Sequence, residues 1–137
     1  MKAQARIISE FLIFCIGIVL VIFVWNTFSD TQTRIKSFTI TEQLSWIADE
    51  ISFSIAKLVS IDKNATLKLL VPKLLFDEYY VIKANETLIL KSHSATVRET
   101  LFGLGKYYNI SGFIMSSQII IPIHYNGSIY IGVKHGH

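Results

Sequence analysis

The longest apolar run of the chain extends without interruption from Phe11 to Trp25. Flanking isoleucines and Phe28 lengthen it, so that residues 7–28 provide the roughly 20 residues that a helix needs to cross a bilayer core. The run is apolar on all sides, which is not typical of a helix that buries one stripe. We therefore predict a transmembrane helix over residues 6–28. A cleavable signal sequence is the alternative, with a poor cleavage site at Thr27–Ser29.

A second helical pattern follows, with apolar residues spaced by three and four from about residue 34 to 59. Neither proline nor glycine separates it from the apolar run. The pattern predicts an amphipathic extension over residues 29–61, and one long helix from about 6 to 59. Two helices with a loop near 29–33 are the alternative. The stripe consists of Ile35, Phe38, Ile40, Leu44, Ile47, Ile51, Ile55 and Leu58.

After residue 62 the pattern changes to short runs rich in β-branched and aromatic residues. Pro122 suggests a sheet edge or a strand end, Asn126-Gly127 favours a type I′ hairpin turn, and Asn85-Glu86 a second turn. Residues 93–109 fit either a strand or a short helix. The expected class is α+β, a long N-terminal helix packed on an antiparallel sheet formed by residues 62–137. The predicted strands are Thr66–Val71, Tyr79–Lys83, Thr87–Lys91, Phe113–Ile123 and Ser128–Val133.

The charge distribution predicts the orientation of the chain. Lys2 and Arg6 precede the apolar run, which favours a cytoplasmic N-terminus and an external C-terminal domain. The remainder carries eleven Lys and Arg residues against nine Asp and Glu residues, so the net charge of +3 gives no indication of nucleic-acid binding. Cys15 is the single cysteine, and it excludes an intramolecular disulfide.

Glu10 is a carboxylate at the edge of the apolar run, where an unpaired charge is costly. Its spacing from Arg6 allows a local i,i+4 ion pair. Alternatively, Glu10 pairs with a positive group on a neighbouring subunit and sets the register between helices. The spacing alone favours the local pair.

The N-terminal sequence from Lys2 to Phe11, followed by the apolar stretch, resembles the class III signal peptide of archaeal type IV pilins and pilin-like proteins. In that family a prepilin peptidase removes a short basic leader, and an acidic residue lies five positions into the mature chain. Cleavage between Ala5 and Arg6 would place Glu10 at that position. The usual basic residue before the cleavage site is replaced by Gln4.

The resemblance implies that the mature protein assembles through its N-terminal helix. The residues that would carry assembly are Glu10, Phe11, Phe14 and Ile18, and the leader would comprise residues 1–5. The implied partners are further copies of the chain in a filament, the membrane, the prepilin peptidase and the pilus assembly machinery. The α+β pattern also matches the family loosely.

Four of the five asparagines begin an Asn-x-Ser/Thr sequon, which is the acceptor of N-glycosylation. All four lie in predicted turns or loops, where a bulky glycan is tolerated. The alternative is coincidence, because asparagine and serine are common in turns. The sequons agree with an external C-terminal domain; they are Asn64, Asn85, Asn109 and Asn126.

Catalytic motifs are missing from the sequence, including phosphate-binding loops and metal-binding His-Glu helix spacings. His135 and His137 could touch a metal, but solvated terminal histidines are the more common case. Asp77-Glu78 fits a polar turn, and Ile119–Ile121 with Tyr79-Tyr80 fit a core better than a subunit interface. We expect no enzyme, no cofactor and no metal site.

These observations predict a structural subunit of a type IV pilus-like archaeal filament. It would be held in the cell membrane before assembly and displayed on the cell surface afterwards. One alternative is a single-pass anchored extracellular domain that binds a partner or acts like a stator and does not polymerise. A secreted enzyme with an ordinary signal sequence is the other.

Overall fold

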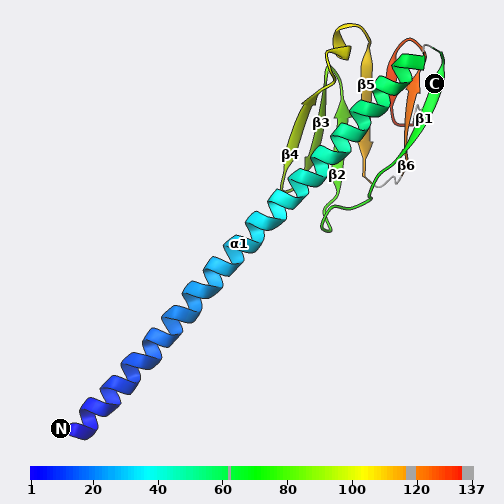
Figure 1. Ribbon diagram of the computed structural model, residues 1–137. Coiled ribbons are helices and arrows are strands. Elements are labelled where there is room, and N and C mark those ends of the chain that lie inside the picture. Colours follow the sequence, from blue (N-terminus) through cyan, green and yellow to red (C-terminus); the bar gives the residue numbers. More distant parts are fainter. Residues whose placement is uncertain (62, 117–119, 134–137) are drawn as a thin grey trace. The chain divides into compact units, whose positions relative to one another are not determined.

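The computed structural model describes residues 1–61, 63–116 and 120–133 (Figure 1). One α-helix and seven strands make up most of it, and the α-helix precedes all the strands in the chain. In chain order they are α1 (Lys2–Ile61), β1 (Ala65–Leu70), β2 (Tyr80–Ala84), β3 (Thr87–Ser92), β4 (Thr96–Thr100), the short 3-10 helix η1 (Leu104–Lys106), β5 (Ile110–Met115), β6 (Ile120–Tyr125) and β7 (Ile129–Ile131).

A single uninterrupted helix forms α1, so the prediction of one long helix is confirmed and a loop near residues 29–33 is excluded. The polar stretch that links its two halves contains threonine hydroxyls that donate to carbonyl oxygens four residues earlier, and it lacks proline and glycine. Thr27 donates to Phe23 at 2.9 Å, and Thr31 donates to Thr27 at 2.8 Å. These hydroxyls are therefore satisfied within the helix itself.

The chain divides into two compact units, Met1–Lys36 and Ser37–His137. The N-terminal unit consists of helix alone. It contains an apolar stretch that is long enough to cross a membrane, and none of that stretch is buried within the structure. This unit is therefore compatible with membrane anchoring.

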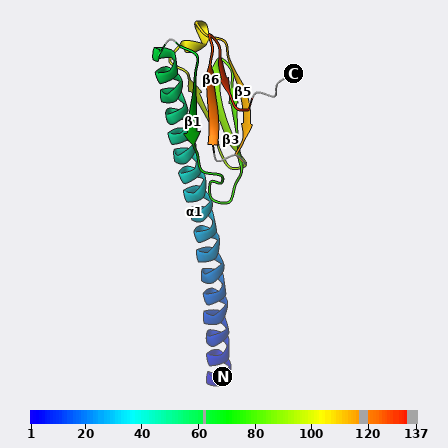
Figure 2. The same cartoon turned by 90° about the vertical axis from the view of Figure 1, so that its right-hand side faces the viewer.

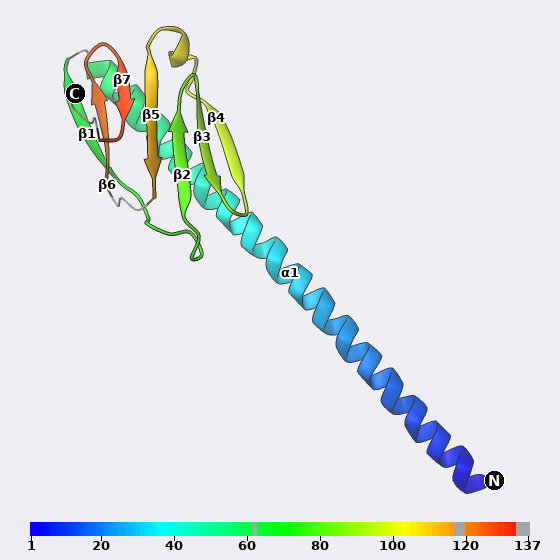
Figure 3. The ribbon, with the colours of Figure 1, turned by 180° about the vertical axis from the view of Figure 1, so that it is seen from behind.

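The C-terminal unit contains the rest of α1 and one seven-stranded sheet in the order β1-β6-β7-β5-β2-β3-β4 (Figure 3). All neighbouring strands are antiparallel except β5 and β7, which run parallel. The predicted α+β class is confirmed, and the parallel pair is a detail that the sequence did not indicate. Within this unit α1 covers one face of the sheet (Figure 2).

The core lies between α1 and the inner face of the sheet. Six isoleucine and leucine residues of the predicted helical stripe are buried, from Ile40 to Leu58. They pack against strand residues that are almost fully buried, including Ile82, Leu90 and Ile123. Each such side chain contributes about 1.5–3 kcal/mol when it leaves water. Ile35 and Phe38, the first two members of the stripe, are instead exposed.

The predicted strand Phe113–Ile123 is wrong, because two strands, β5 and β6, occupy this region. Strand β5 ends at Met115, and the buried polar residue Ser116 follows it directly. The backbone N–H of Ser116 donates to the carbonyl of Tyr80 at 2.9 Å, and the Ser116 hydroxyl accepts from the Tyr80 N–H at 2.9 Å.

The prediction for Pro122 is also wrong, because it lies in the middle of β6, an interior strand between β1 and β7. The carbonyl of Pro122 accepts a 2.9 Å bond from the N–H of Gly132, one residue beyond the end of β7. In an antiparallel pair the N–H that proline lacks would have donated to the carbonyl of the same residue, Gly132. The sheet therefore accommodates Pro122 where β7 has already ended.

Both predicted hairpins are present, β2–β3 at Asn85-Glu86 and β6–β7 at Asn126-Gly127. The second turn is not of type I′, which requires positive φ at both central residues. Gly127 has a φ of 90°, whereas Asn126 is not among the residues with positive φ. The ambiguous region 93–109 contains both strand β4 and helix η1.

The prediction of a core role for the two apolar clusters is half correct. Tyr80 and Ile121 are buried, but Tyr79, which directly precedes β2, and Ile120 are exposed, because successive residues of an extended chain point to opposite faces. Ile119 lies outside the described residues. Tyr80 donates its hydroxyl to the carbonyl of Pro72 at 2.5 Å, and burial raises the pKa of Tyr80 to about 12.

Gly112 permits the close approach of β5 to β7. A Cβ at this position would lie 2.3 Å from the carbonyl oxygen of Ile131, its parallel partner. We therefore predict that Gly112→Ala destabilises the C-terminal unit by about 1–3 kcal/mol or more, as overpacking at a backbone contact does.

Thermal unfolding of the purified chain in detergent, followed by near-ultraviolet circular dichroism, measures this effect. Thr96→Ala is the matched control, because Thr96 is an exposed strand residue of the same unit and belongs to no sequon. A Gly112→Ala variant as stable as the control would contradict the proposed close approach.

Candidate assembly and glycosylation sites

The predicted leader and assembly residues all lie on α1 within the N-terminal unit. Ala5 and Arg6 are exposed in its first turns. The Nε atom of Arg6 lies 3.1 Å from Oε1 of Glu10, and both side chains are largely exposed. The local i,i+4 ion pair therefore forms within one chain, as the spacing predicts.

Phe11, Phe14 and Ile18 lie on one face of α1, at spacings of three and four residues. Their side chains are 65%, 65% and 44% exposed. Beside them, Gly17 leaves an open space on the helix surface, since a Cβ there would meet nothing within 4 Å. Small residues of this kind allow helices to approach closely in a membrane. These residues thus form an exposed apolar face with a small residue beside it.

The four sequon asparagines lie at one end of the sheet, which we call the sequon end. Strand register establishes this, because Ala65 pairs with Tyr125, Tyr125 with Ile129, and Ile129 with Ile110. Ala84 lies in the same end region, opposite Gly112 and Leu88. Each asparagine is the exposed residue directly next to one of these strand ends; they are Asn64, Asn85, Asn109 and Asn126.

The sequon end is also the end at which α1 finishes, since Ile61 leads directly into the segment before β1. The opposite end lies near Ser37, whose hydroxyl donates to the carbonyl of Ser94 at 3.4 Å. The chain enters the C-terminal unit at Ser37, so the sequons are gathered at the far end of that unit. The sequence identified the four sequons but not their common location.

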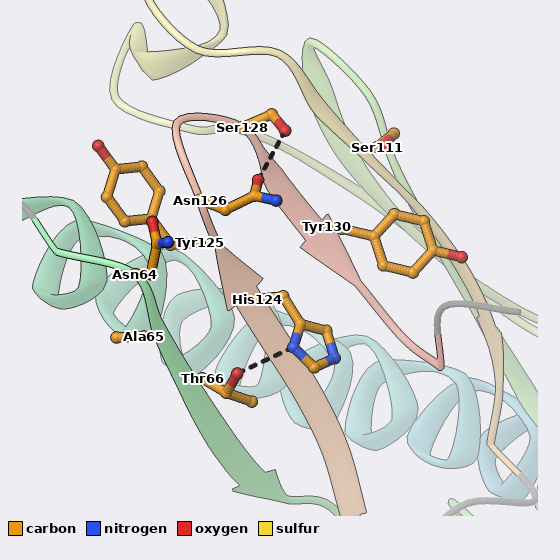
Figure 4. A pocket seen from close by; sticks show the side chains of 9 residues that line it. All are labelled: Asn64, Ala65, Thr66, Ser111, His124, Tyr125, Asn126, Ser128 and Tyr130. Carbon is orange, nitrogen blue, oxygen red and sulfur yellow. Dashed lines mark hydrogen bonds between the residues drawn. The ribbon is translucent and has the colours of Figure 1, made fainter. Parts of the chain in front are cut away.

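A hollow of about 490 Å³ lies at the sequon end, and two sequon asparagines line it (Figure 4). Thr66 Oγ1 and His124 Nδ1 lie 2.9 Å apart, and Ser128 donates to Oδ1 of Asn126 at 3.1 Å. The lining combines hydroxyl, amide and imidazole groups with apolar carbon, and it contains no Asp, Glu, Lys or Arg. A glycan attached at Asn64 or Asn126 would extend from the rim of this hollow. Its lining residues are Asn64, Ala65, Thr66, Ser111, His124, Tyr125, Asn126, Ser128 and Tyr130.

Two carboxyl groups meet at the edge of the sheet. Glu99 on the edge strand β4 points towards α1, where Asp49 lies beside it. Burial raises the pKa of Glu99, and the negative charge and hydrogen bond of Asp49 raise it further, while the Ser52 hydroxyl acts in the opposite direction. An inward-pointing charge on an edge strand also opposes pairing with another sheet.

Metal binding has no visible basis in residues 1–61, 63–116 and 120–133, where no cluster of three or more His, Cys, Asp or Glu side chains could hold an ion. His135 and His137 lie outside these residues. Asp77 and Glu78 form the expected polar turn: Glu78 accepts bonds from the Ser94 N–H and hydroxyl at 3.0 and 2.5 Å, and an isolated bridge links Leu75 to Glu78.

Comparison with known proteins found no matching family model, no matching curated protein and no matching solved structure.

We predict that the sequon asparagines carry N-glycans when the protein is made in its native host. Each single Asn→Gln change at residues 64, 85, 109 and 126 should lower the mass of the protein by one glycan, because all four side chains are exposed at the sequon end. Intact-mass spectrometry measures the difference. Asn26→Gln is the matched control, since Asn26 is the only asparagine without a sequon. Unchanged glycan mass in all four variants would contradict the prediction.

The Asp49–Glu99 pair predicts a pH dependence of stability. Because the folded protein binds the Glu99 proton more tightly than the unfolded chain, the site favours folding at low pH, and this contribution is lost as the pH rises through the raised pKa. Glu99→Gln should therefore stabilise the protein at neutral pH by about 0.5 kcal/mol, a value limited by solvent screening. The gain should vanish below the ordinary glutamate pKa of about 4.3.

Thermal unfolding of the chain in detergent at both pH values tests this expectation. Glu86→Gln removes an exposed carboxylate from the neighbouring hairpin turn and serves as the control. Equal effects of the two substitutions at neutral pH would show that Asp49 and Glu99 do not interact significantly.

Proposed function

We propose that the protein is a structural subunit of a type IV pilus-like filament of the archaeal cell surface, assembled through its N-terminal helix. The observation that supports this proposal is the distribution of apolar residues along α1. Its first half exposes apolar residues on every side, and its second half buries a stripe against the sheet. An all-round apolar helix requires lipid or other helices as its surroundings. Assembly would replace the lipid around this helix with the helices of other subunits.

The location of the sequons supports an extracellular role for the C-terminal unit. Bulky, hydrated glycans at one end of the sheet would leave the outer side of α1 and most of the open face of the sheet uncovered. Such a distribution is compatible with close packing of neighbouring subunits. The N-terminus would lie in the cytoplasm before processing by a prepilin peptidase, as its basic residues indicate.

One observation favours a second candidate function, a single-pass anchored extracellular domain that binds a partner or acts like a stator. The 3.1 Å ion pair between Arg6 and Glu10 already satisfies the carboxylate within one chain. In that case Glu10 needs no neighbouring subunit, and the leader is retained. The two candidates differ in the N-terminus of the mature protein and in the consequence of removing the Glu10 charge.

Mass spectrometry of the N-terminal peptide from the native membrane fraction separates these candidates. A mature N-terminus at Arg6 is expected for the filament subunit, because cleavage after Ala5 places Glu10 near the new terminus. Met1 or Lys2 at the N-terminus would support the anchored domain. A terminus near Asp30 would contradict both and indicate an ordinary signal sequence.

Glu10→Gln provides a second test in the native host. For a filament subunit, loss of the charge should abolish surface filaments, or reduce them at least about tenfold, while the protein stays in the membrane. Electron microscopy and membrane fractionation measure the two quantities. Asp30→Asn is the matched control, since Asp30 is an exposed acid beyond the other end of the apolar run. Normal filaments in the Glu10→Gln variant would contradict the proposed role of Glu10.

A further inference from the structure

The C-terminal unit has two uncovered surfaces on opposite sides. Helix α1 packs on one face of the sheet, and no described element covers the other face (Figures 2 and 3). One face open to water is common for antiparallel sheets, whose outward positions are then mostly polar. The outward positions of this sheet are also mostly polar, but several large apolar side chains are exposed among them.

We call this outward side the sheet face; it combines apolar and basic residues. Leu70, Phe113 and Met115 are 69%, 58% and 59% exposed, and Ile120 is 52% exposed. The cross-strand register places Arg98, Ile89, Lys83 and Phe113 in one row, in which basic and apolar side chains alternate.

A further exposed lysine lies in each of two other strands, Lys68 in β1 and Lys91 in β3. Among the outward positions of the described strands there is no aspartate or glutamate, because Glu99 points towards α1. The sheet face is thus a positively charged surface with exposed apolar groups between the charges.

The outer side of α1 in the C-terminal unit has the complementary composition, and we call it the helix stripe. It comprises Phe38, Glu42, Trp46, Asp49 and Phe53, which are all exposed and follow one another at spacings of four, four, three and four residues, and it ends before the exposed Lys57. These spacings keep the five side chains on one side of the helix. Three aromatic side chains therefore alternate with two carboxylates.

We propose that the helix stripe of one copy docks on the sheet face of the next copy. Aromatic residues of the stripe would lie against the exposed apolar residues of the sheet. The carboxylates of Glu42 and of Asp49, which also lies beside Glu99 of its own chain, would face lysine and arginine. Because the two surfaces differ and lie on opposite sides of one unit, the contact is head-to-tail and repeats in one direction. This inference rests on the proposed filament function and specifies how the C-terminal units contact one another.

Trp46 reports directly on this contact. In a Trp25→Phe variant it is the only tryptophan of the full chain, and it is 57% exposed. With rising protein concentration in detergent micelles, we expect a blue shift of its emission and lower quenching by acrylamide. A blue-shifted emission that does not depend on protein concentration would show that detergent or lipid, and not a second copy, covers the stripe; it would overturn the proposal.

Charge reversal tests the partner surfaces. Lys83→Glu with Lys91→Glu on the sheet face, or Glu42→Lys with Asp49→Lys on the helix stripe, should each weaken self-association about tenfold or more, since like charges then meet. Combining all four changes should restore association. Lys73→Glu with Lys106→Glu changes two exposed lysines that lie outside α1 and outside the strands; it is the matched control and should associate like the parent.

Mixing separates a head-to-tail contact from a symmetric one. The sheet-face variant retains its helix stripe, and the helix-stripe variant retains its sheet face, so a mixture should form pairs but no longer assemblies. With Trp46 kept only in the sheet-face variant, its emission should shift when the helix-stripe variant is added. Absence of this shift, or undiminished association of both variants alone, would overturn the proposal.

Cys15 distinguishes failure of this inference from failure of the proposed function. It lies on α1 in the N-terminal unit and is the only cysteine, so its oxidative cross-linking in the same samples reports contact between N-terminal helices. Cross-linking through Cys15 with a fully quenchable Trp46 would overturn the docking of helix stripe on sheet face and leave the filament function intact. Absence of both signals at all concentrations would contradict both.

Discussion

The burial of one isoleucine and leucine stripe of α1 against the inner face of the sheet determines the arrangement of the C-terminal unit. The stripe from Ile40 to Leu58 fixes which side of the helix is hidden, and thereby which side presents Phe38, Trp46 and Phe53. The same packing also determines which alternate residues of each strand point towards α1, because only inward positions can contact the helix. The helix stripe and the sheet face are both exposed because α1 and the sheet pack against each other through their other sides.

Sequence periodicity was sufficient for the helix and for most strands because the signals there are local. The apolar run, the three-four spacing and the absence of proline made α1 predictable along its length. The errors arose where long-range contacts decide the outcome. Ser116 directly follows β5 and bonds to Tyr80 through its N–H and its hydroxyl, and Pro122 is tolerated in an interior strand because β7 stops one residue short of its position. Neither partner is close in sequence.

The candidate sites show the same division. The Arg6–Glu10 pair follows from its spacing, and the sequons follow from their motif. The gathering of Asn64, Asn85, Asn109 and Asn126 at one end depends on strand order and register, which no local pattern contains. The exposed helix stripe could not be predicted from the sequence for a different reason. A residue such as Phe38 fits an apolar periodicity as well as a core residue does, and only the position of the sheet reveals that it points outward.

The restriction of the sequons to one end has a mechanical consequence. Hydrated chains attached to a single end of each unit would form a polymer brush when many units lie side by side, and neighbouring brushes repel one another through the osmotic pressure of the water that they hold. That pressure would act at the ends of the units and not across their flat surfaces. Glycans would then space the tips of the subunits while the surfaces beneath them remain free to adhere.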